Sequence, residues 1–196
     1  MGSAISGHAV PRTVLLGGLV SFALVVAGWA IAVADQKDTR LPGLFDDLKK
    51  ASSSDEADVI EAKIWSIWLQ ANDPSIDKLM EQGSTAMQMR DFKAAMQSFD
   101  AIIDRKPDFA EGWNKRATLY YLMGDYQHSL ADIDRTLELE PRHIGALSGL
   151  GLVNMQLERE EAAADAFQRV LDIDPQSASA KMNLAIVNDL LKRKSI

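Results

Sequence analysis

The sequence predicts an all-α solenoid of stacked helical hairpins. Prolines recur at Pro74, Pro107, Pro141 and Pro175, so the successive gaps are 33, 34 and 34 residues. A fixed period of this size is typical of repeat architectures. Each period has room for two helices of about 14 residues, and helices that short depend on packing against neighbours for stability. We therefore expect each unit to be a hairpin that is stable only within a stack.

Aligned units repeat the same sizes of side chain at the same positions. Units that start at Ile76, Ala110 and Ile144 carry a large residue at the fourth position and a small one at the eighth: Leu79, Trp113 and Leu147, then Gly83, Ala117 and Gly151. The twentieth position is small and the twenty-fourth is bulky: Ala95, Ser129 and Ala163, then Phe99, Ile133 and Phe167. Small residues let two antiparallel helices approach closely, and bulky residues fill the space between units.

These residues resemble the pattern of the tetratricopeptide repeat (TPR) family, W-x2-L-G-x2-Y, then A-x3-F and a closing proline. The resemblance covers Ile76 to Pro175, with departures at Gln82 and Arg116 in place of leucine and at Ala86 and Asn154 in place of tyrosine. It implies a right-handed α-solenoid with repeats in 75–175, divided by period into 76–109, 110–143 and 144–177. Residues 176–196 repeat the first half of the pattern, which predicts a C-terminal capping helix with polar Lys181 at the fourth position.

The pattern is fainter before the first full unit. Residues 43–74 predict a degenerate N-terminal hairpin, whose second helix opens at Ser53 with Glu56 in a capping box. Trp65 and Trp68 make that helix apolar on more than one face. We expect it to pack on the first full unit and on the short helix before it, and we expect residues 35–42 to be a loose linker.

The first 34 residues predict export. No charged residue occurs from Thr13 to Ala34, and Ala32 and Ala34 form an A-x-A site before Asp35. This is the chemistry of a signal peptide cleaved after Ala34. As a helix, the 22 uncharged residues would also cross a hydrocarbon core of about 30 Å, so an uncleaved inner-membrane anchor stays open. Both interpretations place the folded part in the periplasm.

Composition excludes several classes of function. Apolar residues make up 47% and charged residues 25% of the chain, the net charge is −7, and cysteine is absent. Mixed charges argue against a nucleic-acid partner, and the lack of cysteine excludes thiolate chemistry and disulfides. His128 and His143 are interpreted as an exposed helix histidine and a turn histidine, without a companion at metal-ligand spacing. No catalytic motif is present, so we expect neither an enzyme nor a cofactor nor a bound metal.

The resemblance also implies where a partner would bind. In TPR proteins the concave wall is drawn from the second, fifth, sixth, ninth, twelfth and thirteenth positions of each unit. Transferred to this sequence, they give a predicted groove of thirteen residues: Met80, Ser84, Met87, Asn114, Lys115, Thr118, Tyr121, Ser148, Leu152, Met155, Met182, Asn183 and Ile186. Methionine suits surfaces that accept several apolar shapes. TPR domains that grip a chaperone's terminal carboxylate use lysine, asparagine and arginine, whereas Met80 and Ser84 occupy two of those positions here.

These inferences predict a protein-binding scaffold in the cell envelope, with a peptide or protein partner of unknown identity in the groove. The whole chain resembles small exported TPR proteins of Gram-negative bacteria, alphaproteobacteria in particular. Two alternatives stay open: a membrane-anchored assembly factor, such as the TPR subunits of cytochrome c maturation, and an accessory subunit of an envelope hydrolase.

Overall fold

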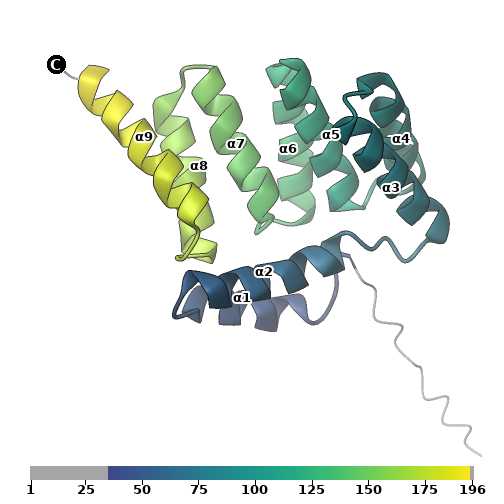
Figure 1. The fold of residues 1–196 in the computed structure, drawn as a ribbon, viewed down its shortest axis with the longest axis horizontal. Helices are drawn as coiled ribbons and strands as arrows, with labels where there is room; N and C mark the ends of the chain where they lie inside the picture. The colour runs from purple at the N-terminus through teal and green to yellow at the C-terminus, as the bar shows by residue number, and fades with distance from the viewer. Residues whose placement is uncertain (1–34, 195–196) are drawn as a thin grey trace, which may run out of the picture. The chain divides into compact units, whose positions relative to one another are not determined.

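The computed structural model describes residues 35–194, and in that range the protein consists of nine α-helices without a strand (Figure 1). The all-α class is therefore confirmed. The helices are α1 Leu41–Lys50, α2 Ser54–Trp68, α3 Pro74–Gln88, α4 Phe92–Arg105, α5 Ala110–Met123, α6 Tyr126–Leu139, α7 Ile144–Gln156, α8 Glu160–Ile173 and α9 Ala178–Lys194. The predicted export segment, 1–34, lies outside the described residues. None of the described helices has the length and apolar character needed to span a membrane.

Helices α3 to α8 form three hairpins that stack side by side, and α9 follows against α8 (Figure 1). The second and third hairpins begin at Ala110 and Ile144, the residues at which the repeat register starts a unit. The first begins at Pro74, where Asp73 caps the helix by accepting the N–H of Ser75. Pro107 and Pro141 lie in the turns between consecutive hairpins, and Pro175 lies in the turn between α8 and α9. The proline period therefore marks where one hairpin ends and the next begins.

The eighth position is small because the two helices of a hairpin touch there. A Cβ added to Gly83 would lie 2.6 Å from the Phe99 ring, and one added to Gly151 would lie 2.5 Å from Phe167. The middle hairpin has Ala117 at this position and the smaller Ile133 opposite. The extra methyl on one helix is thus matched by a smaller side chain on the other.

The turn inside each hairpin uses one residue with left-handed backbone geometry. These residues are Arg90 with φ 61°, Gly124 with φ 79° and Glu158 with φ 56°, spaced at one repeat length. Only glycine adopts this geometry without a steric cost. Asp91 and Asp125 then cap the second helix by accepting the N–H groups of Ala94 and His128.

The α1–α2 hairpin lies across the ends of the stacked hairpins (Figure 1). We expected α2 to pack on the first full unit, and this is wrong. Its buried cluster contains Ile144 and Leu147 of α7, Val170 of α8 and Ala180 of α9. The expected packing of α2 on the short helix before it, α1, is present, while its other apolar face covers the ends of α7, α8 and α9.

The segment before α1 is held in place and is not a loose linker. Asp35 and Asp38 are 1% and 2% exposed. Lys106, in the turn between α4 and α5, lies 3.5 Å from Asp35 Oδ2 and donates a hydrogen bond to the Ala71 carbonyl at 2.5 Å. Lys37 forms an ion pair with Asp108 at 2.7 Å. These contacts fasten both ends of the α1–α2 hairpin to one turn of the repeat array.

Candidate functional site

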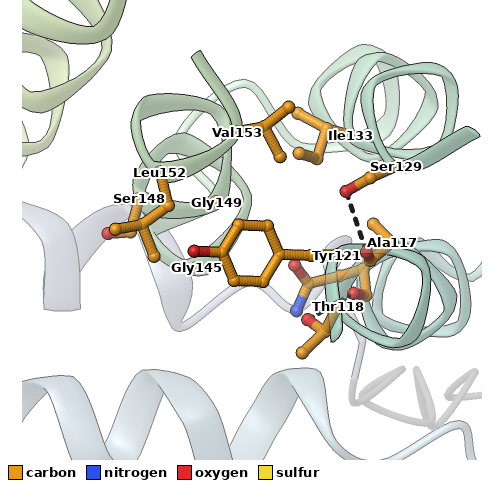
Figure 2. A pocket seen from close by; sticks show the side chains of 11 residues that line it. Ala117, Thr118, Tyr121, Ser129, Ile133, Gly145, Ser148, Gly149, Leu152 and Val153 are labelled. Atoms are coloured by element: carbon orange, nitrogen blue, oxygen red, sulfur yellow. Dashed lines mark hydrogen bonds between the residues drawn. The ribbon is translucent and has the colours of Figure 1, made fainter. Parts of the chain in front are cut away.

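A hollow of about 150 Å³ opens between α5 and α7, the first helices of the second and third hairpins (Figure 2). We call it the α5–α7 hollow. It is lined by Asn114, Ala117, Thr118, Tyr121, Ser129, Ile133, Gly145, Ser148, Gly149, Leu152 and Val153.

Two glycines one helical turn apart line the space. Gly145 and Gly149 of α7 place no side chain between the helices, and a Cβ on Gly149 would be in ordinary contact with Ile133, 3.5 Å away. Tyr121 from α5 extends over the opening toward Leu152 and Ser148 of α7 (Figure 2). The wall is therefore mostly apolar, with a polar rim.

Three polar side chains of the lining already have hydrogen-bond partners. Ser129 Oγ donates to the Ala117 carbonyl at 2.8 Å, and Thr118 Oγ1 donates to the Asn114 carbonyl at 2.9 Å. Asn114 Nδ2 donates to Glu111 Oε2 at 2.9 Å. None of the lining residues is an acid, a lysine, an arginine or a histidine.

Five of the thirteen residues of the predicted groove meet in this hollow: Asn114, Thr118, Tyr121, Ser148 and Leu152. Their role in binding stays a prediction, but the structure brings them together as the register implied. The register also gives Gly145 and Gly149, at the second and sixth positions of their unit. Sequence reasoning missed them because a glycine contributes to a pocket through the side chain that it lacks.

The other eight residues do not line the hollow. Met80 is a core residue, 5% exposed, and Met87 and Met155 pack partly buried against hairpin cores. Ser84 is half-buried on α3, and Lys115 pairs with Glu111. The remaining three lie on α9, where Asn183 is half-buried while Met182 and Ile186 are 60% and 45% exposed.

A buried polar cluster lies next to the hollow, where α2 meets the repeats. His143, expected as a turn histidine, caps α7 and is fully buried. Its Nδ1 accepts the Ala146 N–H at 3.2 Å, which leaves the ring proton on Nε2, 3.0 Å from Glu111 Oε2. Lys115 Nζ lies 3.2 Å from the other oxygen, Oε1, as a charge contact without hydrogen-bond geometry.

This cluster shifts the titration of Glu111. Burial alone would raise the pKa of the Glu111 carboxyl, but the hydrogen bond from His143 and the charge of Lys115 outweigh burial and hold the pKa below its ordinary value. Glu111 is therefore ionised at neutral pH although it is 1% exposed. Among the residues described, no group of three or more acids and histidines is placed to hold a metal ion.

Two tryptophans of α2 cover this cluster. Trp68 stacks on His143 with ring centroids 4.2 Å apart, and its Nε1 is buried without a hydrogen-bond partner in the described part of the chain. Trp65 meets His143 edge-on at 5.6 Å and donates from Nε1 to Glu61 at 2.9 Å. A Cβ on Gly145 would lie 2.7 Å from the Trp65 ring, so α2 borders the end of the α5–α7 hollow.

Comparison with known proteins gives matches over the same residues. The tetratricopeptide repeat family model matches 80–127 and 114–178. A TPR repeat-containing protein of Rhizobium etli is 36% identical over 152 residues, which are 78% of this chain and 74% of that protein. The small glutamine-rich tetratricopeptide repeat-containing protein 2 of Mycosarcoma maydis is 24% identical over 61% of this chain, but the match spans only 34% of its own length.

A solved structure has the same fold. The first TPR domain of Spaghetti (RPAP3), bound to the HSP90 peptide SRMEEVD, superposes with a TM-score of 0.58 and 20% identity, covering 60% of this chain and 94% of that domain.

Proposed function

Because the chain belongs to the tetratricopeptide repeat family, we propose that it is a non-enzymatic scaffold that holds a peptide or protein segment against the first helices of its repeats. One observation carries the proposal: residues of two hairpins at the predicted groove positions form the α5–α7 hollow. Concave, mostly apolar sites with a few polar groups at the rim are where proteins bind ligands.

The bound peptide of the structural neighbour supports this function but not the same ligand. The RPAP3 domain holds the acidic HSP90 peptide SRMEEVD. In this chain, Met80 occupies a position where carboxylate-gripping TPR domains place a charged residue, and it is buried in the core of the first hairpin. We propose a partner segment that binds mainly through apolar contact.

We also propose that the scaffold works in the bacterial cell envelope, with its repeats in the periplasm. The support is the uncharged run from Thr13 to Ala34, the A-x-A site before Asp35, and a relative in the bacterium Rhizobium etli. Mass spectrometry of the native chain after osmotic shock tests the setting. A chain that starts at Asp35 is expected in the released fraction, or one that starts at Met1 in the membrane; recovery from the cytoplasm would contradict the proposal.

Binding is tested by selecting peptides from a random library on the full chain and measuring their affinity by fluorescence anisotropy. Tyr121→Ala removes a ring that covers the hollow, so it should weaken the selected peptides about tenfold, the effect of losing a partly buried aromatic contact. Tyr120→Ala is the matched control, because Tyr120 does not line the hollow and stacks on His128 of α6 at 5.1 Å. Equal affinity of both variants, or failure to select any peptide, would contradict the function.

A further inference from the structure

We propose that the α5–α7 hollow is a selectivity pocket for one aromatic or branched aliphatic side chain, carried by an uncharged stretch of the partner. The inference rests on the proposed function and names the chemistry of the segment that would bind. Three features of the described residues carry it: the size of the hollow, the pairing of the cations beside it and its closed end.

The size fits one side chain. The hollow holds about 150 Å³, which is the volume of an apolar protein cavity that binds benzene. Ala117, Ile133 and Val153 form its apolar wall, and the hydroxyls of Thr118 and Ser129 are engaged by backbone carbonyls. A phenyl or isobutyl group would bury its surface against this wall without breaking the hydrogen bond of either hydroxyl.

The helix α5 offers no free positive charge beside the hollow, because both of its cations are already paired with carboxylates. Lys115 lies 3.2 Å from the buried Glu111 carboxylate. Arg116 forms hydrogen bonds with Asp132 at 2.8 Å and with Asp100 at 2.7 Å. An acidic partner segment would lose the hydration of its carboxylates without gaining a free positive charge in return. An uncharged segment has no charged group to desolvate. Charge complementarity therefore favours an uncharged occupant.

The hollow ends at α2. The Trp65 ring lies against Gly145, where a Cβ would come within 2.7 Å of it, and Asn114 Nδ2 is 3.5 Å from the same point. A second side chain of the partner therefore finds no room beyond Gly145, toward the start of α7. The α1–α2 hairpin, which is outside the repeats, thereby limits the pocket to one anchoring group.

The first test uses side-chain analogues and does not depend on any peptide. Toluene, the side chain of phenylalanine, is titrated against the full chain while the NMR signal of the Ile133 δ-methyl group is followed, with benzoate as the anionic counterpart. Toluene should give a saturable shift that is lost in Thr118→Phe, which fills the hollow from its rim, and kept in Ala131→Phe at an exposed position of α6. An equal response to benzoate, or no response to toluene, overturns the inference.

The second test uses the peptides selected on the full chain. Each should contain one Phe, Tyr, Leu or Ile in an uncharged stretch. Replacing that residue by alanine should cost roughly tenfold or more in affinity, as should Thr118→Phe, while Gly149→Ala should cost less. Peptides that depend on Tyr121 but are acidic and lack an apolar anchor would refute the pocket and leave the scaffold function standing. If toluene binds but no peptide depends on Tyr121, the function fails, and with it the inference.

Discussion

At the scale of single residues, the departures from the repeat pattern have structural reasons. Arg116 stands where the pattern has leucine, and it joins Asp100 of α4 to Asp132 of α6 while lying over the Trp113 ring at 5.1 Å. The hydrogen bond to Asp132 has the largest effect on the pKa of the Arg116 guanidinium, and together with the one to Asp100 it raises that pKa. Three successive helices are therefore linked by charge at the position where the third hairpin packs Leu150.

Substitution of Gly149 and of Gly151, two neighbouring glycines of α7 about half a helical turn apart, should have different effects on stability. Gly151→Ala places a Cβ 2.5 Å from the Phe167 ring, and the ring cannot move within a packed core. We expect this variant to lose about 1–3 kcal/mol in the free energy of unfolding, measured by urea denaturation.

Gly149→Ala is the matched control, because its Cβ would be 3.5 Å from Ile133, in ordinary contact. Alanine also favours the helix by about 1 kcal/mol over glycine. This variant should be as stable as the parent or more stable. If both variants had the same stability, Gly151 would not mark the close approach of the two helices.

At the scale of elements, the α1–α2 hairpin covers a buried ionised group of the repeats. Glu111 receives hydrogen bonds from His143 and Asn114, and Trp68 covers the His143 ring. Buried charges of this kind are costly unless they are fully paired. All partners of Glu111 lie on α5 and at the start of α7, and the hairpin adds the Trp68 ring that covers His143. This position of the hairpin therefore keeps the paired charge buried.

The lowered pKa of Glu111 predicts acid sensitivity. Its ordinary value is 4.5 and its value in the folded protein is lower, so ionised Glu111 stabilises the fold above about pH 4.5. As the pH falls from 4.5 through the lower pKa of Glu111 in the folded protein, the carboxylate becomes protonated and this contribution is lost. Glu111→Gln should cost about 1–3 kcal/mol at pH 7 and flatten the acid side of the stability curve, measured by thermal unfolding from pH 3 to 7.

The same substitution at exposed Glu81 serves as the control and should leave the curve unchanged. If Glu111→Gln destabilised the protein equally at every pH, the loss would come from packing and not from ionisation.

At the scale of the whole described region, the hairpin changes how the repeats depend on one another. In a simple array each repeat contacts only its neighbours. Here one buried cluster joins α1 and α2 to α7, α8 and α9. The hairpin thus connects the third repeat and the cap with the turn between α4 and α5, where Lys106 donates to Ala71.

Truncation of Trp68, which lies in this buried cluster, should make the unfolding of the repeats less cooperative. Trp68 is 1% exposed, and truncation of a buried tryptophan typically costs about 3–5 kcal/mol. For Trp68→Ala we expect this loss together with a lower urea m value, because the repeats would no longer unfold as one cooperative unit. Trp113→Ala, at a half-buried tryptophan of α5, is the comparison. An unchanged m value in Trp68→Ala would mean that the hairpin does not couple the repeats.

The sequence alone determined the features that repeat. The proline period located the turns, the small residues at the eighth position located the contact between helices, and the register selected five of the residues that line the hollow. These features are local or periodic, so a single chain displays them directly.

Only the tertiary structure decided the position of the α1–α2 hairpin, the burial of His143 and Glu111, and the space left by Gly145 and Gly149. Residues such as Trp68 and His143 are 75 positions apart, and no periodic pattern relates them. Their contact depends on how the turns of several repeats line up to form a surface, which is a property of the assembled stack.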